Sequence, residues 1–430
     1  MQININLPDK VLWLFFWAGL ALVFGAFVPI IGTEAAIYVL IIMVSCLTAV
    51  FFSTLFGHPP LVLKIIFLAV SVRIVMLILL KIYSFQNGLD GFFPGDVDAL
   101  AYHGDAVKAL ATHSWYEALQ GNLSYTIFVA FLYNLLGIDM MIPQLFNLGV
   151  SVIIVPLLYE LGDRVGGEKA AVTASLLWSL FPSAVFWSIS LLKDAFVVFG
   201  MVLSSFLVLS LTKAKISVGD LLIGLSGIMI ISYMRPQFLL AISIPVLLYL
   251  AVQFFRGNSS FLRNCILIVA AVGVFSATSA GDIILQTFDT STSNEGVERI
   301  NEIALDGGSG IHIVTLFSPE IRWLVQLPFS IFAPFPWQWF SFSQAIYLMS
   351  AFEMLCWYVL YYYMWKNRKD IFDNHTGKMI FLYACSIFFA VSFSLPNIGS
   401  IYRYRLAAMA MLLPLIFFTT RKKNKRAGPL

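Results

Sequence analysis

The chain has 430 residues, of which 60% are hydrophobic and only 11% are Asp, Glu, Lys or Arg, and its mean hydropathy is +0.88. A water-soluble protein carries about a quarter charged residues, so the composition excludes a soluble globular domain and indicates an all-α polytopic membrane protein. The formal net charge of +3 excludes little, because the placement of Lys and Arg carries the information in membrane proteins. The four cysteines lie in apolar segments without paired spacing, which is typical of buried thiols rather than disulfides or a metal site.

A helix needs about 20 mostly apolar residues to cross a bilayer, and runs of that length recur along the chain. The first, Val11 to Gly32, ends without a small-residue cleavage site and is followed at once by a second, so we interpret it as an uncleaved helix. About twelve transmembrane helices are predicted, at residues 11–32, 35–56, 61–83, 141–162, 170–190, 195–212, 218–234, 237–255, 262–280, 344–365, 377–395 and 404–419.

Basic residues predict the orientation of these helices. The terminal segment from Arg421 to Arg426 is strongly basic, which favours the cytoplasm and contact with anionic membrane lipids. Lys10 and the basic groups at residues 164–169, 213–215, 256–263 and 366–369 fall on the same side for an even number of spans. Both termini are therefore predicted to be cytoplasmic, and the compact loops suit a bacterial inner (plasma) membrane.

Two long loops are predicted on the opposite, outer side, at residues 84–140 and 281–343, within one membrane domain that covers residues 1–430. In the first loop, the apolar segment from Leu123 to Gly137 is too short to span and is predicted to be an interfacial helix. In the second loop, the segment from Leu324 to Phe340 is interrupted by prolines and is predicted to be interfacial or re-entrant.

The first loop contains a dense group of acids. From Asp98 to about Ala111 the residues favour a helix, and Asp98 suits its N-terminus. Asp98, Tyr102 and Asp105 then share one helix face, and the last two are predicted to bind substrate. One carboxylate, from Asp98 or from the nearby Asp96, can act as a general base, while another holds a metal or orients a hydroxyl. The alternative is a helix cap with solvated acids.

The order of parts around this helix resembles the GT-C superfamily of membrane glycosyltransferases, which use dolichyl- or polyprenyl-phosphate sugars. Asp98-x-x-x-Tyr102-x-x-x-Ala106 is similar to the first-loop motif of that superfamily. It is followed by an aromatic helix ending at Gly137, a span ending Leu158-Tyr159-Glu160-Leu161-Gly162, a basic turn from Arg164 to Lys169, an alanine-rich helix and Phe181-Pro182-Ser183. The resemblance covers residues 64–211, and two predicted helices precede the usual first span of the superfamily.

The resemblance implies transfer of a sugar from a polyprenyl-phosphate-linked donor to a glycan, lipid or protein acceptor on the outer face. Asp98 would match the loop aspartate that activates the acceptor or binds a metal, Mg²⁺ or Mn²⁺, if one is used. The superfamily motif often has adjacent acids, whereas Val97 and Ala99 flank Asp98 here, so Asp96 stays an alternative. No nucleotide-binding glycine loop and no nucleic-acid-binding stretch is present, so neither partner is expected.

Four basic residues are predicted at the outer ends of helices, against the positive-inside trend: Lys193, Arg235, Arg403 and Arg405. A phosphate leaving group needs cationic partners, and the planar guanidinium suits it. We therefore predict phosphate binding by Arg403 and Arg405. For Lys193 and Arg235, phosphate binding stands beside two alternatives, which are lipid headgroups and salt bridges to the acids.

Other polar residues allow a functional and a structural interpretation. Arg73 lies mid-span, where an arginine is costly, and is either functional, or part of a buried ion pair, or a snorkelling side chain. His103 is either a site residue or a satisfied neighbour, and neither His113 nor His312 has a spacing that assigns a role.

Two other functions compete with glycosyl transfer. A polysaccharide polymerase or ligase of the O-antigen type shares the outer arginines and uses a lipid diphosphate. A lipid-linked sugar flippase or transporter would concentrate polar residues near the bilayer midplane and often shows two similar halves. Here the polar residues cluster at the predicted outer face and no repeat is visible, so transport is disfavoured.

Overall fold

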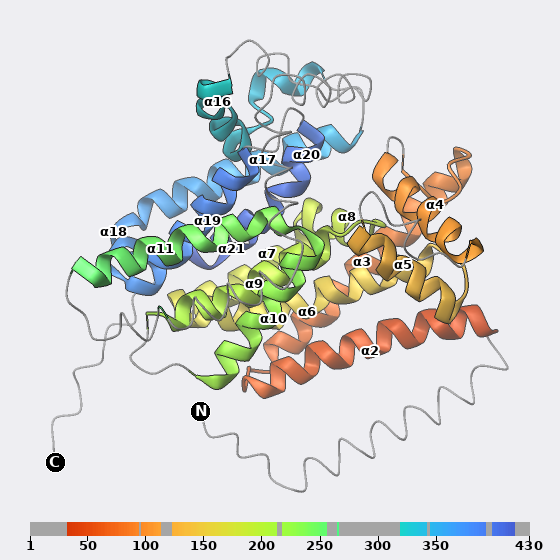
Figure 1. Cartoon of the computed structure of the whole chain (residues 1–430), viewed down its shortest axis with the longest axis horizontal. Helices are drawn as coiled ribbons and strands as arrows, with labels where there is room; N and C mark the ends of the chain where they lie inside the picture. Colours follow the sequence, from red (N-terminus) through yellow and green to blue (C-terminus); the bar gives the residue numbers. More distant parts are fainter. Residues whose placement is uncertain are drawn as a thin grey trace, which may run out of the picture.

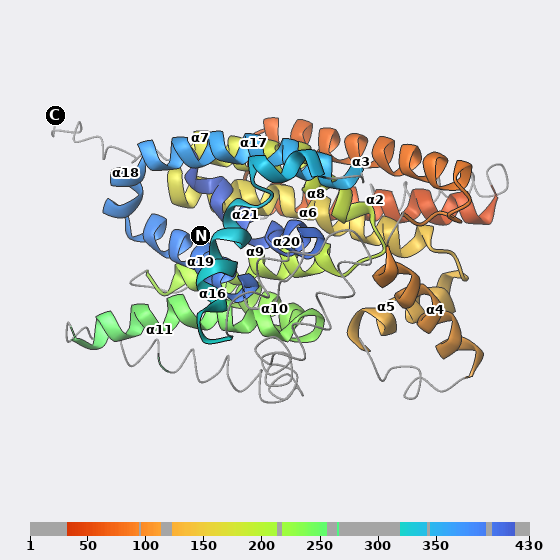
Figure 2. The same ribbon diagram turned by 90° about the horizontal axis from the view of Figure 1, so that it is seen from above.

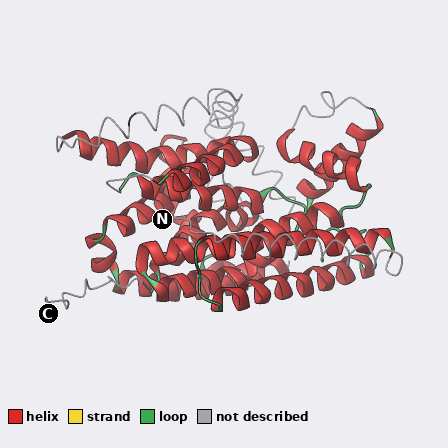
Figure 3. Cartoon of the chain, turned by 90° about the horizontal axis from the view of Figure 1, so that it is seen from below, coloured by secondary structure: helices red, strands yellow, loops and turns green. Residues whose placement is uncertain are grey.

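The computed structural model describes residues 32–93, 96–112, 123–212, 217–255, 265, 319–341, 345–392 and 398–417. In these residues every regular element is a helix (Figures 1 and 3), as the composition predicts. The α-helices are α2 (Thr33–Leu55), α3 (Leu61–Gln86), α4 (Val97–Ala111), α5 (Leu123–Leu136), α6 (Met141–Gly166), α7 (Glu168–Leu180), α8 (Pro182–Ile189), α9 (Asp194–Ser210), α10 (Val218–Met234), α11 (Leu239–Phe255), α16 (Pro319–Phe332), α17 (Ala345–Lys366), α18 (Arg368–Asp373), α19 (His375–Ser392), α20 (Ile398–Tyr404) and α21 (Leu406–Leu412). Short 3-10 helices are η2 (Pro236–Phe238), η3 (Pro336–Ser341) and η4 (Leu413–Leu415).

Five helical segments in the described residues are long and apolar enough to cross a membrane: α2, α3, α6, the segment Pro236–Phe255 and α19. The bent pair α7 and α8 adds a sixth if it counts as one span. The chain thus has the character of a helical membrane protein. The number of about twelve spans stays a prediction, because α9 and α10 have only 17 residues each and the predicted helices at 11–32 and 262–280 lie outside the described residues, Cys265 excepted.

The long helices run side by side, and α4 and α5 gather at one end of the bundle, at the right of Figures 1 and 2. Helix α6 is the central helix, in contact with α2, α3, α7, α8 and α9. Its most apolar window is 78% buried, against 28% for α2 and 33% for α3. Because α2 and α3 expose apolar side chains along most of their length, their outward faces suit lipid rather than water.

Two glycines allow neighbouring helices to touch closely. A Cβ on Gly162, in α6, would lie 2.5 Å from Cα of Ala171 in α7. A Cβ on Gly227, in α10, would lie 2.5 Å from the carbonyl oxygen of Gly200 in α9. Small residues allow this kind of close backbone approach in membrane helix pairs. They bring α7 against α6 and fix the α9–α10 hairpin, and both helix pairs support the candidate site described below.

Helices α7 and α8 form one apolar segment that bends by 54°. The bend lies at Phe181 and Pro182, and proline has no N–H for the carbonyl four residues earlier. Arg73 fills this gap, because its guanidinium donates to the carbonyl oxygens of Trp178 at 3.1 Å and Ser179 at 3.3 Å. In total it makes six hydrogen bonds, to four carbonyls and the hydroxyls of Ser151 and Ser188. Arg73 is thus held by helix-end carbonyls rather than by a carboxylate or by snorkelling.

The other side of the bend is occupied by Glu353 of α17. Its carboxylate accepts from the backbone N–H and the hydroxyl of Ser183, both at 2.6 Å. Tyr402 and Trp357 donate to the same carboxylate, which is completely buried. An anion at the N-terminus of α8 and a cation at the C-terminus of α7 compensate the two helix ends. Arg73 and Glu353 thus supply hydrogen-bond partners to backbone groups on both sides of the bend.

One predicted element differs from the structure, and others agree with it closely. The predicted span 404–419 is interrupted at Arg405 and tightens into η4 at Pro414, so the described part consists of short pieces. A helix of 14 residues, α5, replaces the predicted interfacial helix almost residue for residue. In the second long loop, α16 and η3 flank Pro334, as the proline pattern predicts for a broken segment. All four cysteines are free thiols.

Candidate functional site

Helix α4 presents the acids of the first long loop. It begins at Val97 with Asp96 as its N-cap residue, and the Asp96 side chain makes no capping hydrogen bond. Asp98 lies in the first turn, where the helix N-terminus favours a negative charge. The helix extends to Ala111, as predicted. The backbone of Ala99, in the first turn, still acts on the Asp96 carboxylate and lowers its pKa, so capping remains the structural interpretation of Asp96, and the contacts of Asp98 described next are additional to it.

Asp98 is paired with Arg403, which is 305 residues further along the chain. Nη1 of Arg403 donates to Oδ2 of Asp98 at 2.6 Å, and Nε of Arg403 lies 3.2 Å from Oδ2 of Asp194. Asp194 is the first residue of α9 and is buried, whereas the Asp98 side chain is 48% exposed. One arginine thus joins α20, α4 and α9.

Arg235 approaches the same carboxylate from the end of α10. Its Nη1 lies 3.5 Å from Oδ1 of Asp194, and its guanidinium stacks on Tyr404 with Cζ 3.8 Å from the ring centre. Arg403 also contacts Tyr404, through a hydrogen bond to the hydroxyl at 3.2 Å. Nε and Nη1 of Arg235 and Nε of Arg403 have no hydrogen-bond partner among the described residues. Nη1 of Arg235 and Nε of Arg403 are ion-paired with Asp194, so of these three nitrogens only Nε of Arg235 lacks both a hydrogen bond and an ion pair among the described residues.

The charges of this cluster separate the two acids. Burial alone would raise the pKa of Asp98, but the charge and hydrogen bond of Arg403, with smaller effects of Arg235 and Lys193, lower it below its usual value. For Asp96, burial dominates, and the charges of Asp98 and Asp194 add to it against the opposing effect of Arg403, which raises its pKa to about 7. Asp98 is thus the fixed anion, and Asp96 is the acid that titrates near neutral pH.

The cations are also distinguished by their surroundings. Lys193, directly before α9, is buried, and burial together with the charges of Arg235 and Arg403 lowers its pKa to about 7, against the effect of Asp194 and Asp98. For Arg403, burial opposes the charged form, but Asp194, Tyr404 and Asp98 raise its pKa well above its usual value. Arg403 therefore keeps its charge, whereas Lys193 can lose its proton near neutral pH.

The predicted residues do not all reach this cluster. Tyr102 is buried next to it and packs edge-on against Tyr125, with ring centres 5.1 Å apart. Asp105 is half exposed and faces Lys108 of its own helix at 3.9 Å. His103 hydrogen-bonds the hydroxyl of Tyr133 at 2.8 Å and so holds α4 to α5, as a satisfied neighbour. His113 and His312 lie outside the described residues.

Arg405 does not join Arg403, contrary to our expectation that the two act together. Its side chain is completely buried, donates a hydrogen bond to the carbonyl of Ala333 at the end of α16, and interacts electrostatically with Glu353. The physical reason is helical geometry, because positions two apart on a helix point in different directions. Arg405 thus belongs to the polar group around Glu353.

Two residues of the cluster were missed in the sequence. Asp194 holds both arginines, and Tyr404 is the ring on which both guanidinium groups lie. A buried acid directly after Lys193 and an aromatic residue between Arg403 and Arg405 were the available signals. Neither identifies a partner without the fold, because the contacts are long-range.

The donor set does not fit a divalent metal ion. Oδ2 of Asp98 is bonded to Arg403, and Asp194 faces two guanidinium groups, so Mg²⁺ would meet positive charge at both carboxylates. In the part of the chain that the structure describes, no group of three or more His, Cys, Asp or Glu is arranged to hold a metal. The Mg²⁺ or Mn²⁺ expectation is therefore not carried into the mechanism.

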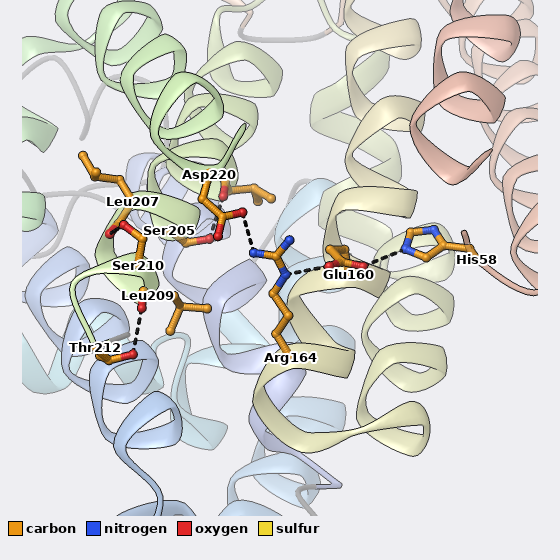
Figure 4. Close-up of polar contacts among 10 residues, drawn as sticks. His58, Glu160, Arg164, Ser205, Leu207, Leu209, Ser210, Thr212 and Asp220 are labelled. Carbon is orange, nitrogen blue, oxygen red and sulfur yellow. Dashed lines mark hydrogen bonds and ion pairs between the residues drawn. The ribbon is translucent and has the colours of Figure 1, made fainter. Parts of the chain in front are cut away.

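A second charged cluster lies around the C-terminal part of α6 (Figure 4). Arg164 donates to Glu160 and to Asp220 of α10, both at 2.6 Å, and Glu160 also contacts His58 at 3.1 Å. The guanidinium lies over the ring of Phe206 at 4.9 Å. Because both carboxylates take up the hydrogen bonds of Arg164, this cluster ties α6 to α10 and to the segment before α3.

No family model, no curated protein and no solved structure matches this chain.

Proposed function

We propose that this chain is a membrane glycosyltransferase of the GT-C type, which moves a sugar from a polyprenyl-phosphate-linked donor to an acceptor hydroxyl at the outer membrane face. The observation that carries the proposal is the contact of Asp98 with Arg403. It joins the acid helix of the first long loop to α20, and Asp194 in turn joins Arg403 to Arg235 at the end of α10. In this proposal the protein lies in a bacterial inner membrane with both termini in the cytoplasm.

The basic residues suit the phosphate of the donor. Arg235 and Arg403 share the carboxylate of Asp194, Nε of Arg235 has no hydrogen-bond partner among the described residues, and Lys193 adds a third positive charge. Guanidinium groups bind phosphate oxygens with paired hydrogen bonds. As the bond to the sugar breaks, negative charge grows on the phosphate, and fixed positive charges stabilise that transition state more than the ground state.

The acids suit proton transfer from the acceptor. In the proposed reaction the acceptor oxygen attacks the anomeric carbon, the bond from that carbon to the phosphate oxygen breaks, and the electron pair leaves with the polyprenyl phosphate. The acceptor proton passes to a carboxylate. We assign this role to Asp96, because its pKa of about 7 suits a general base at neutral pH. Asp98 is the weaker base and holds Arg403 in place. Attack opposite the leaving group inverts the anomeric centre.

A polysaccharide polymerase or ligase is the second candidate, because three cations also suit a lipid diphosphate. The two candidates differ in their donor, which is a single sugar on a monophosphate or an oligosaccharide on a diphosphate. The size of the lipid-linked product on a gel separates them.

The test measures sugar transfer from a panel of radiolabelled polyprenyl-phosphate sugars by the full-length protein in proteoliposomes. We expect Asp96→Asn and Arg403→Gln to lower the rate by at least about 100-fold, as is typical for loss of a catalytic base or of charge stabilisation. Asp370→Asn, which changes an exposed acid of α18, is the matched control and should keep the full rate. Full activity in both Asp96→Asn and Asp98→Asn variants that insert normally would contradict the proposed acid chemistry.

A further inference from the structure

Asn147 of α6 lies between the two halves of the candidate site. Its side chain is completely buried, and its Nδ2 lies 2.6 Å from the carbonyl oxygen of Ser190 and 2.8 Å from that of Leu192. The same nitrogen lies 2.8 Å from the hydroxyl of Tyr125, in α5. One amide therefore contacts both the segment that leads into α9 and the helix that packs on α4.

The first contact concerns the turn between α8 and α9. Residues 190–193 are not helical, yet Ser190, Leu191 and Leu192 are buried. Buried carbonyls outside regular structure need a donor, most of all where no water is present. Asn147 supplies that donor to two of them. The turn ends in Lys193 and Asp194, so the amide fixes the backbone that presents both side chains.

The second contact concerns the acid helix. Tyr125 packs edge-on against Tyr102, with ring centres 5.1 Å apart, and Tyr102 lies one turn after Asp98 on α4. Helices α4 and α5 pack along their length. The position of Asp98 is thus linked through two rings to the same amide that holds Asp194. Both acids pair with Arg403, whose location depends on their separation.

We propose that Asn147 is a positioning residue, which sets the spacing between the Lys193–Asp194 turn and the acid helix and so the placement of Arg403. The effect on catalysis rests on the function proposed above, whereas the structural link does not. An amide is the side chain that fits, because its NH₂ group offers two hydrogens from one nitrogen, which the carbonyls of Ser190 and Leu192 and the hydroxyl of Tyr125 share. Leucine has a similar size and offers none, and aspartate offers at most one hydrogen, when protonated.

The structural link is tested by hydrogen exchange with mass spectrometry on the full-length protein in detergent. In Asn147→Leu, we expect amides of residues 190–197 and of α4 to exchange about tenfold faster, the effect of losing a buried hydrogen bond. The matched control is Gln144→Leu, because Gln144 lies one turn away on α6, is buried, and has a side-chain oxygen without a partner among the described residues. Unchanged exchange in Asn147→Leu overturns the proposal.

The functional consequence is tested with farnesyl phosphate as a soluble probe of phosphate binding, followed by tryptophan fluorescence. We expect Asn147→Leu to weaken binding about tenfold and Gln144→Leu to leave it unchanged. At each pH, the affinity of each variant is divided by the affinity of the unaltered protein. For Asn147→Asp this ratio should rise as pH falls, because a protonated carboxyl regains one hydrogen-bond donor. For Asn147→Leu the ratio should not change with pH.

The two measurements separate failure of the inference from failure of the proposed function. Faster exchange with unchanged binding of farnesyl phosphate overturns the positioning role. Absence of binding in the unaltered protein, together with faster exchange in Asn147→Leu, contradicts the proposed phosphate site and supports the structural link. Weaker binding that Asn147→Asp recovers at low pH supports the whole proposal.

Discussion

Two groups of buried arginines in this protein differ in how their hydrogen-bond donors are used. Arg73 makes six hydrogen bonds, all to neutral oxygens at and around the α7–α8 bend. Arg235 and Arg403 lie next to carboxylates and the ring of Tyr404, yet three of their nitrogens lack a hydrogen-bond partner among the described residues. An unused buried donor destabilises the fold, and Nε and Nη2 of Arg405, outside the cluster, also lack a hydrogen-bond partner among the described residues. What sets Arg235 and Arg403 apart is that they share one carboxylate, that of Asp194.

The difference indicates which arginine serves the fold and which can serve a ligand. Arg73 compensates helix ends that Pro182 leaves without partners, so nothing remains for a substrate. Arg235 and Arg403 are positioned mainly by Asp194, which two guanidinium groups share, and this surplus of positive charge favours an anion that is bound during function.

Replacing Arg73 should cost the most stability. Arg73→Met keeps a similar apolar length but leaves the carbonyls of Trp178 and Ser179 without donors. A buried acceptor left without its donor costs about 1 to 3 kcal/mol, and several acceptors lose theirs here, so we expect a large fall in melting temperature and in the monodisperse fraction after purification. Thermal unfolding in detergent measures both. A melting temperature equal to that of the unaltered protein would show that the bend does not depend on this arginine.

Replacing Arg235 should affect ligand affinity more than stability, which is the opposite of what we expect for Arg73. Arg235→Met leaves Asp194 with Arg403 at 3.2 Å, so we expect a smaller loss of stability than in Arg73→Met. Affinity for farnesyl phosphate should fall by about 100-fold, close to the lower end of the loss seen when a buried charged partner is removed. Fluorescence titration and thermal unfolding of the same sample give both values. Arg368→Gln, which changes an arginine of α18 whose guanidinium lies on Trp365, is the control for a general loss of positive charge.

The pH dependence of transfer should reflect two groups of the cluster. The base Asp96 must be ionised, and its pKa is raised to about 7, so the rate should rise about tenfold per pH unit below 7. Lys193 must be charged to help the phosphate, and its pKa is lowered to about 7, so the rate should fall again above 7. Because the two groups interact, the apparent pKa values of the bell-shaped pH–rate profile belong to the pair and not to either residue.

Lys193→Arg sharpens that prediction. Arginine keeps its charge at every pH of the assay, so the alkaline limb should disappear while the acidic limb stays. Survival of both limbs in this variant would assign the alkaline limb to another group.

The same contrast explains what the sequence predicted and what it missed. The apolar runs predicted α2, α3, α6 and α19 closely, because length and hydropathy are local properties. Asp98 and Arg403 were singled out because charge is rare in this chain, and the fold brings them together. Asp194 was missed because its partners come from α10 and α20, and no local pattern encodes a pairing over such a distance.

Local patterns also failed where a side chain replaced a regular backbone bond. The sequence left two roles open for Arg73, functional or ion-paired. Its actual partners at the bend lie more than 100 residues away and could not be identified from a local pattern. Arg405 was grouped with Arg403 on proximity in sequence, although the helix directs the two side chains to different partners.

The smallest effect is expected at the cluster of Arg164 (Figure 4). Its two carboxylate partners make it an ionic site, in contrast to the neutral oxygens around Arg73. Glu160→Gln removes one charge but leaves Asp220 on Arg164, so stability should fall by about 1 kcal/mol, as for a partly exposed ion pair. Raising the salt concentration should shrink this difference, because salt screens charges that water can reach. The cost of Arg73→Met should not depend on salt, because dipoles rather than charges hold that arginine. Equal salt dependence in the two variants would remove the distinction between ionic and carbonyl-bound arginines on which the assignment of the site depends.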